Sequence, residues 1–448
     1  MITIQDNNYI GKVYSFHEVA DLFPIANKPI KQLCEEDEHL LVFPFNIEDA
    51  EDGISDSSIV ELYVENEKTV RMKSANIMGF VGRNNQQLKI YSRFDNGKQD
   101  YFLHYMLQRV FSYNVFNLDF TSSGDNVLDI LIYMFPVLLK RSMRQGLYKE
   151  YRMVKHNDSN VCGTIDISRH ICENNPFRGA VAYNTREYSF DNSVMELIRH
   201  TIEHIRTIPF GEYILTSNEL IERYVRDIIS CTPSYRHSDR LKVMHENQTP
   251  CIHPYYTEYL ALQKLCIQIL RQEEMKYGIG NDSVLGILFD GAWLWEEYLN
   301  SLLGELGFIH PENKKRTGAI YLFEHGGGQR FPDFWKEDFV LDAKYKKIAI
   351  NDNVFDVDRE DVNQIVTYMF RLKAKKGGII CPLIGNENKI ISKDMHRDAY
   401  KGVMYIYALA IPENCISYDD FVKSISKNER KFLKDIYKLN PRNHYSNS

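Results

Sequence analysis

Several common features are missing from this sequence. None of its eight cysteines forms a C-x-x-C pair, which argues against a zinc knuckle or a thioredoxin-like site. There is no G-x-x-x-x-G-K-[ST] loop, so any dependence on ATP or GTP must come from another chain. The longest apolar run, 127–139, contains Asp129 and Pro136 and is too short to span a bilayer, so we expect a buried helix and no membrane association.

Targeting and repeat signals are also missing. The first residues do not follow the basic-then-apolar order of a signal peptide. We therefore expect a cytoplasmic protein whose cysteines are reduced thiols. The chain shows neither an internal repeat nor a low-complexity tract, which argues against solenoid and linker-rich architectures.

The composition is that of an ordinary globular protein. Of 448 residues, 44% are hydrophobic, 12% aromatic and 26% charged. A chain of this length favours roughly three domains. The net charge of −7 argues against a protein that coats nucleic acid along its whole surface.

The charge is distributed unevenly along the chain. Residues 1–67 hold 15 acidic and three basic residues, whereas residues 423–448 hold seven basic and two acidic residues. Different partners at the two ends would explain this asymmetry, and so would two solvated surfaces. For the basic tail, the alternatives are electrostatic contact with DNA phosphates and a solvated terminal helix.

The periodicity predicts a multidomain α+β and α/β protein. We expect a β-rich amino-terminal domain (1–155), a mainly helical middle region (156–278) and an α/β domain with mixed strands (279–448). Strands are predicted at 40–44, 59–64, 77–82, 88–91, 320–323, 331–346, 378–382 and 403–411, and helices at 101–111, 126–144, 191–208, 218–230, 254–275, 285–303 and 360–373.

The most informative segment is 330–347, which we interpret as a β-hairpin. Its strands are predicted at 331–334 and 339–346, with the turn at 336–338. Because side chains alternate across a strand, Asp342 and Lys344 share one face, and Asp333 approaches from the neighbouring strand. Two carboxylates at a sheet edge form a hard-oxygen site suited to Mg²⁺. A lysine beside the ion can orient or deprotonate the attacking water and offset charge on phosphate.

Short acidic patterns are common, and a charged hairpin face is the simple alternative. Two features favour a site. Apolar residues surround the acids, where unpaired charge is costly, and a third acid, Glu296, lies on a helix before the hairpin. Glu297 is the more natural solvent-facing acid. After the hairpin, Gln364 shares a helical face with Tyr368 and is suited either to hold a water or phosphate oxygen or to cap the core.

At these residues the sequence resembles the PD-(D/E)xK nuclease superfamily, whose acid helix, Pro-Asp hairpin, Asp-x-Lys strand and Gln helix occur in the same order. It is more specifically similar to McrC-like nuclease subunits of McrBC and LlaJI-type restriction systems. The similarity extends over most of residues 75–380. It is carried by segments 79–90, 146–151, 163–170, 186–192, 289–298, 332–333 and 342–345.

The resemblance implies a Mg²⁺-dependent endonuclease subunit that cuts double-stranded DNA. In this family the amino-terminal region docks on a ring of McrB-like AAA+ GTPase subunits and stimulates their hydrolysis. By motif, Asp333, Asp342 and the Ala343 carbonyl would bind the metal. Lys344 would be the catalytic lysine and Glu296 an auxiliary acid. A homodimer through the nuclease domain is a further arrangement consistent with the resemblance.

Two other functions are compatible with these residues. The chain is alternatively an adaptor that activates an AAA+ NTPase and carries a dormant nuclease fold, or a stand-alone DNA repair nuclease. The complete Asp333, Asp342 and Lys344 set argues against dormancy, whereas the acidic amino-terminal part fits a docking surface.

Overall fold

The structure is a computed structural model of the whole chain. It describes residues 2–36, 40–44, 54–83, 86–95, 100–110, 126–208, 211–216, 218–276, 284–311, 318–348, 350–351, 354–355, 357–396 and 401–439. The chain forms two compact units, 125–280 and the remainder (1–124 with 281–448). In the described part, no helix is both long and apolar enough to cross a membrane.

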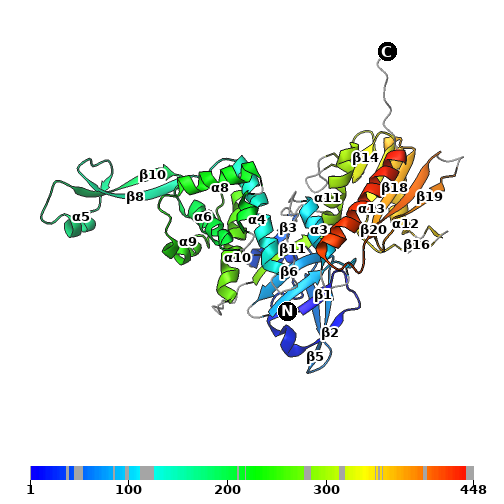
Figure 1. Cartoon of the computed structure of the whole chain (residues 1–448), viewed down its shortest axis with the longest axis horizontal. Helices are drawn as coiled ribbons and strands as arrows, with labels where there is room; N and C mark the ends of the chain where they lie inside the picture. Colours follow the sequence, from blue (N-terminus) through cyan, green and yellow to red (C-terminus); the bar gives the residue numbers. More distant parts are fainter. Residues whose placement is uncertain are drawn as a thin grey trace, which may run out of the picture. The chain divides into compact units, whose positions relative to one another are not determined.

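The first sheet of the larger unit has five strands, in the order β1-β7-β6-β11-β3 (Figure 1). The β6–β7 hairpin is antiparallel, as its sequence predicts, while β1 pairs with β7 and β3 with β11 in parallel. The strands are β1 (Ile2–Gln5), β3 (Leu40–Phe43), β6 (Ile77–Arg83), β7 (Gln86–Tyr91) and β11 (Val284–Asp290).

Strand β11 corrects one prediction. Residues 285–303 were expected to be one helix, but 284–290 form a strand between β6 and β3, and helix α11 (Gly291–Leu303) begins only at Gly291. A strand that is buried on both faces is a continuous apolar run, which periodicity cannot distinguish from a buried helix. As a result, a strand from the carboxy-terminal half of the chain completes the amino-terminal sheet.

A small antiparallel sheet, in the order β2-β5-β4, shares one core with β1, β3, β6, β7 and α2. Apolar residues of both sheets, such as Ile4, Val70 and Leu88, are fully buried in it. The remaining elements here are β2 (Lys12–Ser15), α1 (Phe16–Val19), η1 (Ala20–Leu22), α2 (Ile30–Glu36), β4 (Val60–Val64) and β5 (Thr69–Ser74).

The second large sheet has the order β14-β15-β18-β20-β19, with parallel pairing at its centre and antiparallel strands at both edges. This is the α/β layer with mixed strands that the sequence predicts. Its strands are β14 (Phe334–Lys336), β15 (Phe339–Ala343), β18 (Lys376–Ile384), β19 (Lys389–Asp394) and β20 (Val403–Ile411). Two short pairs flank it: β12 (Ile320–Tyr321) with β13 (Gln329–Arg330), and β16 (Ile350–Asn351) with β17 (Val354–Phe355).

Helices cover both faces of this sheet (Figure 1). Helix α12 (Arg359–Leu372) packs on Val340 and Ile379, while α13 (Tyr418–Leu439) places Phe432 against Tyr407 of the other face. Of the basic tail expected at 423–448, residues 423–439 lie in α13, and one side of this helix is buried, so this part is not a helix solvated on all sides. Helix α11, η4 (Gly304–Leu306) and α3 (Tyr101–Val110) complete the unit.

The smaller unit combines helices with a long β-hairpin (Figure 1). The hairpin was not predicted, and the expected boundary at 155/156 falls inside its first strand, β8. Polar and apolar residues alternate only weakly along its strands, because most of their side chains are exposed or half-buried. The elements are α4 (Asn126–Arg144), β8 (Glu150–Asp158), β9 (Thr164–Ile165), α5 (Ile167–Glu173), β10 (Val181–Ser189), α6 (Ser193–Arg206), α7 (Gly211–Thr216), α8 (Glu219–Cys231), η3 (His237–Asp239), α9 (Arg240–Glu246) and α10 (Tyr259–Lys276).

Candidate active site

The predicted hairpin exists, with its strands shifted from the expected bounds. Strand β14 begins at Phe334, directly after Asp333, and β15 ends at Ala343. The chain turns at Glu337, whose φ of 52° is in the left-handed region. Asp333 therefore precedes the first strand, and its side chain reaches across to accept a 2.7 Å hydrogen bond from the Ala343 backbone N–H.

Asp342 and Lys344 lie on one side of the chain, as the alternation of side chains along a β-strand predicts. Asp342 is 1% exposed and is the last residue but one of strand β15. Lys344 Nζ lies 2.8 Å from Asp342 Oδ2. Within the described structure, that oxygen has no donor aligned as a hydrogen bond, so the contact is an ion pair that leaves the carboxylate poorly satisfied.

The two aspartates perturb each other. Burial raises the pKa of Asp333 well above its usual range, and the Asp342 and Glu296 carboxylates add to this increase. Burial also raises the pKa of Asp342, although Lys344 offsets part of the shift. Burial lowers the pKa of Lys344, but the Asp342, Asp333 and Asp361 carboxylates together outweigh it and the net shift is upward. The carboxylates thus gather more negative charge than the lysine compensates.

Helix α12 supports the lysine from the side of Asp342. Gln364 Oε1 accepts a 2.9 Å hydrogen bond from Lys344 Nζ, and Gln364 Nε2 donates to Tyr368 Oη at 2.7 Å. Tyr368 in turn donates to the Phe331 carbonyl. Gln364 therefore holds the lysine in a chain of hydrogen bonds that returns to the hairpin.

Glu296 approaches from α11 together with a residue that the sequence analysis did not select. His310 Nδ1 lies 2.8 Å from the Asp333 carbonyl oxygen and 3.8 Å from Glu296 Oε1, and its Nε2 lies 3.9 Å from Glu297 Oε1. The His310 ring also stacks on Phe334. His310 links the acid helix to the hairpin, and Glu297 is the more exposed of the two acids, at 31% against 18%.

Asp361 is a second site residue that was not predicted from the sequence. Its carboxylate lies 3.8 Å from Lys344 Nζ and contacts Lys346, so it lies between two lysines. A signal was present, because Asp361 precedes Gln364 by three residues and shares its helical face. For His310 no such pattern exists, since it follows α11 and η4 in an irregular segment.

The donor set fits Mg²⁺ bound mainly by oxygen. In the described part of the chain, no three His, Cys, Asp or Glu side chains form a group able to hold a metal ion. Mg²⁺, however, is commonly held by one or two carboxylates together with substrate phosphate and water rather than by a protein cage. The Ala343 carbonyl points to the same strand edge as its N–H, which donates to Asp333. Asp333, Asp342 and that carbonyl would hold the ion, with Glu296 beside them.

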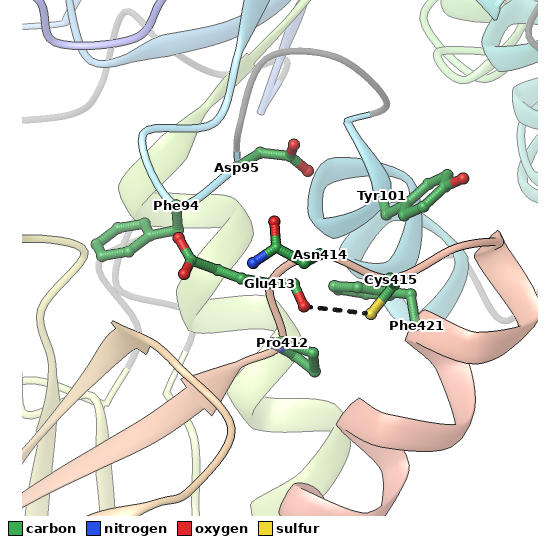
Figure 2. A pocket seen from close by; sticks show the side chains of 8 residues that line it. All are labelled: Phe94, Asp95, Tyr101, Pro412, Glu413, Asn414, Cys415 and Phe421. Carbon is green, nitrogen blue, oxygen red and sulfur yellow. Dashed lines mark hydrogen bonds between the residues drawn. The ribbon is translucent and has the colours of Figure 1, made fainter.

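A pocket elsewhere in the larger unit lies between the segment that follows β7 and the loop that follows β20. Figure 2 shows two residues of the loop after β20, with Asn414 pointing toward Asp95 and Glu413 toward Phe94. Tyr101 also lines the pocket. Its lining is completed by Phe94, Pro412, Cys415 and Phe421. None of the predicted site residues lines it, so it does not bear on the cluster around Asp342.

The fold and this cluster define a multidomain α/β protein with a buried carboxylate–lysine centre at the end of a mixed sheet. The family model described as "McrBC 5-methylcytosine restriction system component" matches residues 72–382. This match spans more than half of the chain, which therefore belongs to the McrBC restriction system component family. A search of curated proteins finds no match.

Two solved structures from Thermococcus gammatolerans are similar. One is a chain of a refined half-complex from a tetradecameric assembly of McrB AAA+ hexamers with bound McrC, at 15% identity and a TM-score of 0.48, covering 97% of this chain and 99% of that chain. The other is a chain of the McrBC complex, at 16% identity and a TM-score of 0.29, covering 68% and 87%. With TM-scores below 0.5, neither supports an argument about this chain.

Proposed function

We propose that this chain is the Mg²⁺-dependent DNA endonuclease subunit of an NTP-dependent restriction system, with a PD-(D/E)xK domain at 279–448. The observation that carries the proposal is the convergence of Asp333, Asp342 and Lys344 at one end of strand β15. Membership of a restriction system family supports a role in DNA cleavage. The substrate is a phosphodiester bond of double-stranded DNA.

Each residue has a separate task in this proposal. Asp333 and Asp342 supply the carboxylates for the ion, which when bound acts as a Lewis acid on the phosphodiester. Lys344, held by Gln364 and Asp342, presents an ammonium group beside them. An ammonium group fixed before the reaction stabilises the charge that develops on the phosphate oxygens.

The energy source for such a system lies on another chain, because this sequence has no nucleotide-binding P-loop. We propose a McrB-like AAA+ GTPase ring as the partner, which this subunit stimulates. The family description, which names a component of a restriction system rather than a whole system, supports a divided function.

One observation favours the alternative of an adaptor with a dormant nuclease fold. The Lys344–Asp342 ion pair satisfies part of the charge that a metal ion would otherwise neutralise. With its charge partly neutralised by Lys344, the Asp333–Asp342–Lys344 cluster would keep its geometry without binding a metal ion. The two functions differ in whether the cluster is needed for cleavage or only for the fold.

The test uses the full chain with its GTPase partner, GTP, Mg²⁺ and plasmid DNA with and without 5-methylcytosine. We expect Asp342→Ala to abolish cleavage while the protein stays folded, as checked by circular dichroism and thermal unfolding. Partner GTPase stimulation should persist. Cleavage by the folded variant would refute the assigned role, and absence of cleavage by the unsubstituted chain would favour the adaptor.

A further inference from the structure

Tyr345 follows Lys344 directly and points to the opposite side of the strand end. It is 6% exposed. Its hydroxyl lies 2.7 Å from Ser92 Oγ and also contacts Met78 Sδ at 3.3 Å. Ser92 and Met78 belong to the amino-terminal β6–β7 region, more than 200 positions earlier in the sequence. The residue next to the candidate catalytic lysine is thus inserted into the amino-terminal sheet.

The Tyr345 ring is fixed as firmly as its hydroxyl. The Arg93 guanidinium lies 4.8 Å from the ring centroid, and the Phe94 ring meets it edge-on at 5.0 Å. Arg93 is itself held by Asp6, with 2.6 Å between Arg93 Nη2 and Asp6 Oδ2, and both residues are buried. A buried, paired guanidinium above an aromatic ring restricts that ring's position.

The same ring contacts the beginning of the acid helix. A Cβ atom at Gly291 would lie 2.9 Å from Tyr345 Cε1, so only glycine lets the first turn of α11 approach this closely. The Gly291 N–H donates to the Asn76 carbonyl at 3.1 Å, and Asn76 Oδ1 accepts a hydrogen bond from Arg93. Tyr345, Ser92, Arg93, Asp6, Asn76 and Gly291 form what we term the anchor cluster.

The anchor cluster joins two parts of the candidate cutting site to the amino-terminal sheet: the end of the strand that carries Lys344 and the beginning of helix α11, which carries Glu296. Lys344 has one backbone constraint on its other side, the 2.9 Å hydrogen bond from its N–H to the Ile380 carbonyl. Strand β15 ends at Ala343, and beyond this bond the chain is held by the buried Tyr345 side chain and by the ion pairs of Lys346 with Asp358 and Asp361. A displacement of the lysine by about 1 Å is enough to lower a rate by orders of magnitude.

We propose that Tyr345 is a positioning residue for Lys344, and that the amino-terminal sheet, through Ser92 and Arg93, is part of the machinery that sets the cutting site. The proposal rests on the proposed nuclease function for its catalytic consequence, but not for its structural one. It implies that any change at the amino-terminal sheet reaches Lys344 through a chain of buried contacts.

The test compares Tyr345→Phe, Ser92→Ala and the double variant with Tyr407→Phe in the full chain. Tyr407 is a matched control, because it is 2% exposed and donates to Asp435 Oδ2 at 3.1 Å in the same unit. Thermal unfolding shows whether the Tyr345 and Ser92 variants lose as much stability as the Tyr407→Phe control. Acetic anhydride labelling followed by mass spectrometry then compares the reactivity of Lys344 with that of Lys346 in each variant.

We expect Tyr345→Phe and Ser92→Ala each to raise Lys344 labelling relative to Lys346 and to lower kcat for cleavage by about tenfold without changing KM for DNA. The double variant should lower kcat little further than either single variant, since each single variant already removes the hydrogen bond between Tyr345 and Ser92. Tyr407→Phe should leave labelling and kcat unchanged. Unchanged Lys344 labelling in both single variants would overturn the positioning role. If labelling changes but the unsubstituted chain does not cut DNA, the positioning role stands and the nuclease proposal fails.

Discussion

Two buried carboxylate clusters in the larger unit differ in how their charge is satisfied. Glu429 of α13 accepts hydrogen bonds from Tyr298 at 2.7 Å and from Tyr105 at 3.0 Å, and Arg109 lies 3.5 Å away. Asp342 faces another carboxylate, and one of its oxygens has no aligned hydrogen-bond donor in the described structure. Burial raises the pKa of both groups. A raised pKa therefore does not separate these two clusters, whereas the hydrogen bonding of their carboxylates differs.

The physical reason is the cost of buried charge. A buried carboxylate surrounded by donors costs little and joins the helices that supply those donors. A pair of neighbouring carboxylates with one lysine retains excess negative charge, which is a feature of sites that bind cations or do chemistry. We therefore propose that Glu429 serves the fold and Asp342 the chemistry, and the following predictions test that division.

A large effect is expected for Lys344→Ala, second only to the loss of cleavage expected when the Asp342 carboxylate is removed. Removing the ammonium group should lower cleavage by about 10²–10³-fold, because one fixed electrostatic contact beside the phosphate is lost. Stimulation of the partner GTPase should be intact. Lys376→Ala, on β18 of the same sheet, is the matched control, and it should cut DNA normally. Equal cleavage by both variants would place Lys344 among structural residues.

Glu429→Gln should act on stability instead. We expect the free energy of unfolding to fall by about 1–3 kcal/mol, since the tyrosines and Arg109 lose their charged acceptor. Cleavage per folded molecule should not change. Asp342→Asn should show the reverse pattern, with cleavage lost and stability maintained or increased, because it removes one of two repelling charges. Denaturant unfolding and cleavage assays on both variants check this contrast.

A pH effect should come from His104 of α3. Burial lowers the pKa of His104 to about 3, against about 6.5 in the unfolded chain. The unfolded state therefore binds more protons below pH 6.5, and stability is present above this value and lost as the pH falls toward 3. Between pH 7 and pH 5 the loss is about 2 kcal/mol. Thermal unfolding of the unsubstituted chain should show this slope and His104→Gln should flatten it, whereas equal slopes would contradict the assignment.

The smallest effect is expected for Asp361→Asn. Asp361 lies between Lys344 and Lys346 on the buried side of α12, so removing its charge should loosen both lysines without removing either. We expect cleavage to fall by about three- to tenfold, equivalent to about 1 kcal/mol of barrier height. A steady-state comparison with Asp358→Asn, whose carboxylate is 72% exposed, measures it. A loss as large as that of Lys344→Ala would make Asp361 part of the central cluster.

Much of the candidate site followed from local pattern. The period of two placed Asp342 and Lys344 on one side of the strand, and their 2.8 Å contact agrees with it. The prediction of Gln364 on the neighbouring helix agrees with its hydrogen bond to Lys344, although the roles of all these residues stay predictions. The fold class, a multidomain protein with mixed strands in its last third, was also predictable from hydrophobic periodicity.

Other features depended on contacts that no local pattern contains. The alternation of side chains and the spacing of helix faces are set by backbone geometry, so the sequence by itself determined which residues of one element act together. It did not determine that 284–290 joins a distant sheet, that His310 links Asp333 to Glu296, or that Tyr345 packs between Ser92 and Gly291. Only the tertiary structure decided these, because they arise when apolar and charged groups far apart in the chain bury one another during folding.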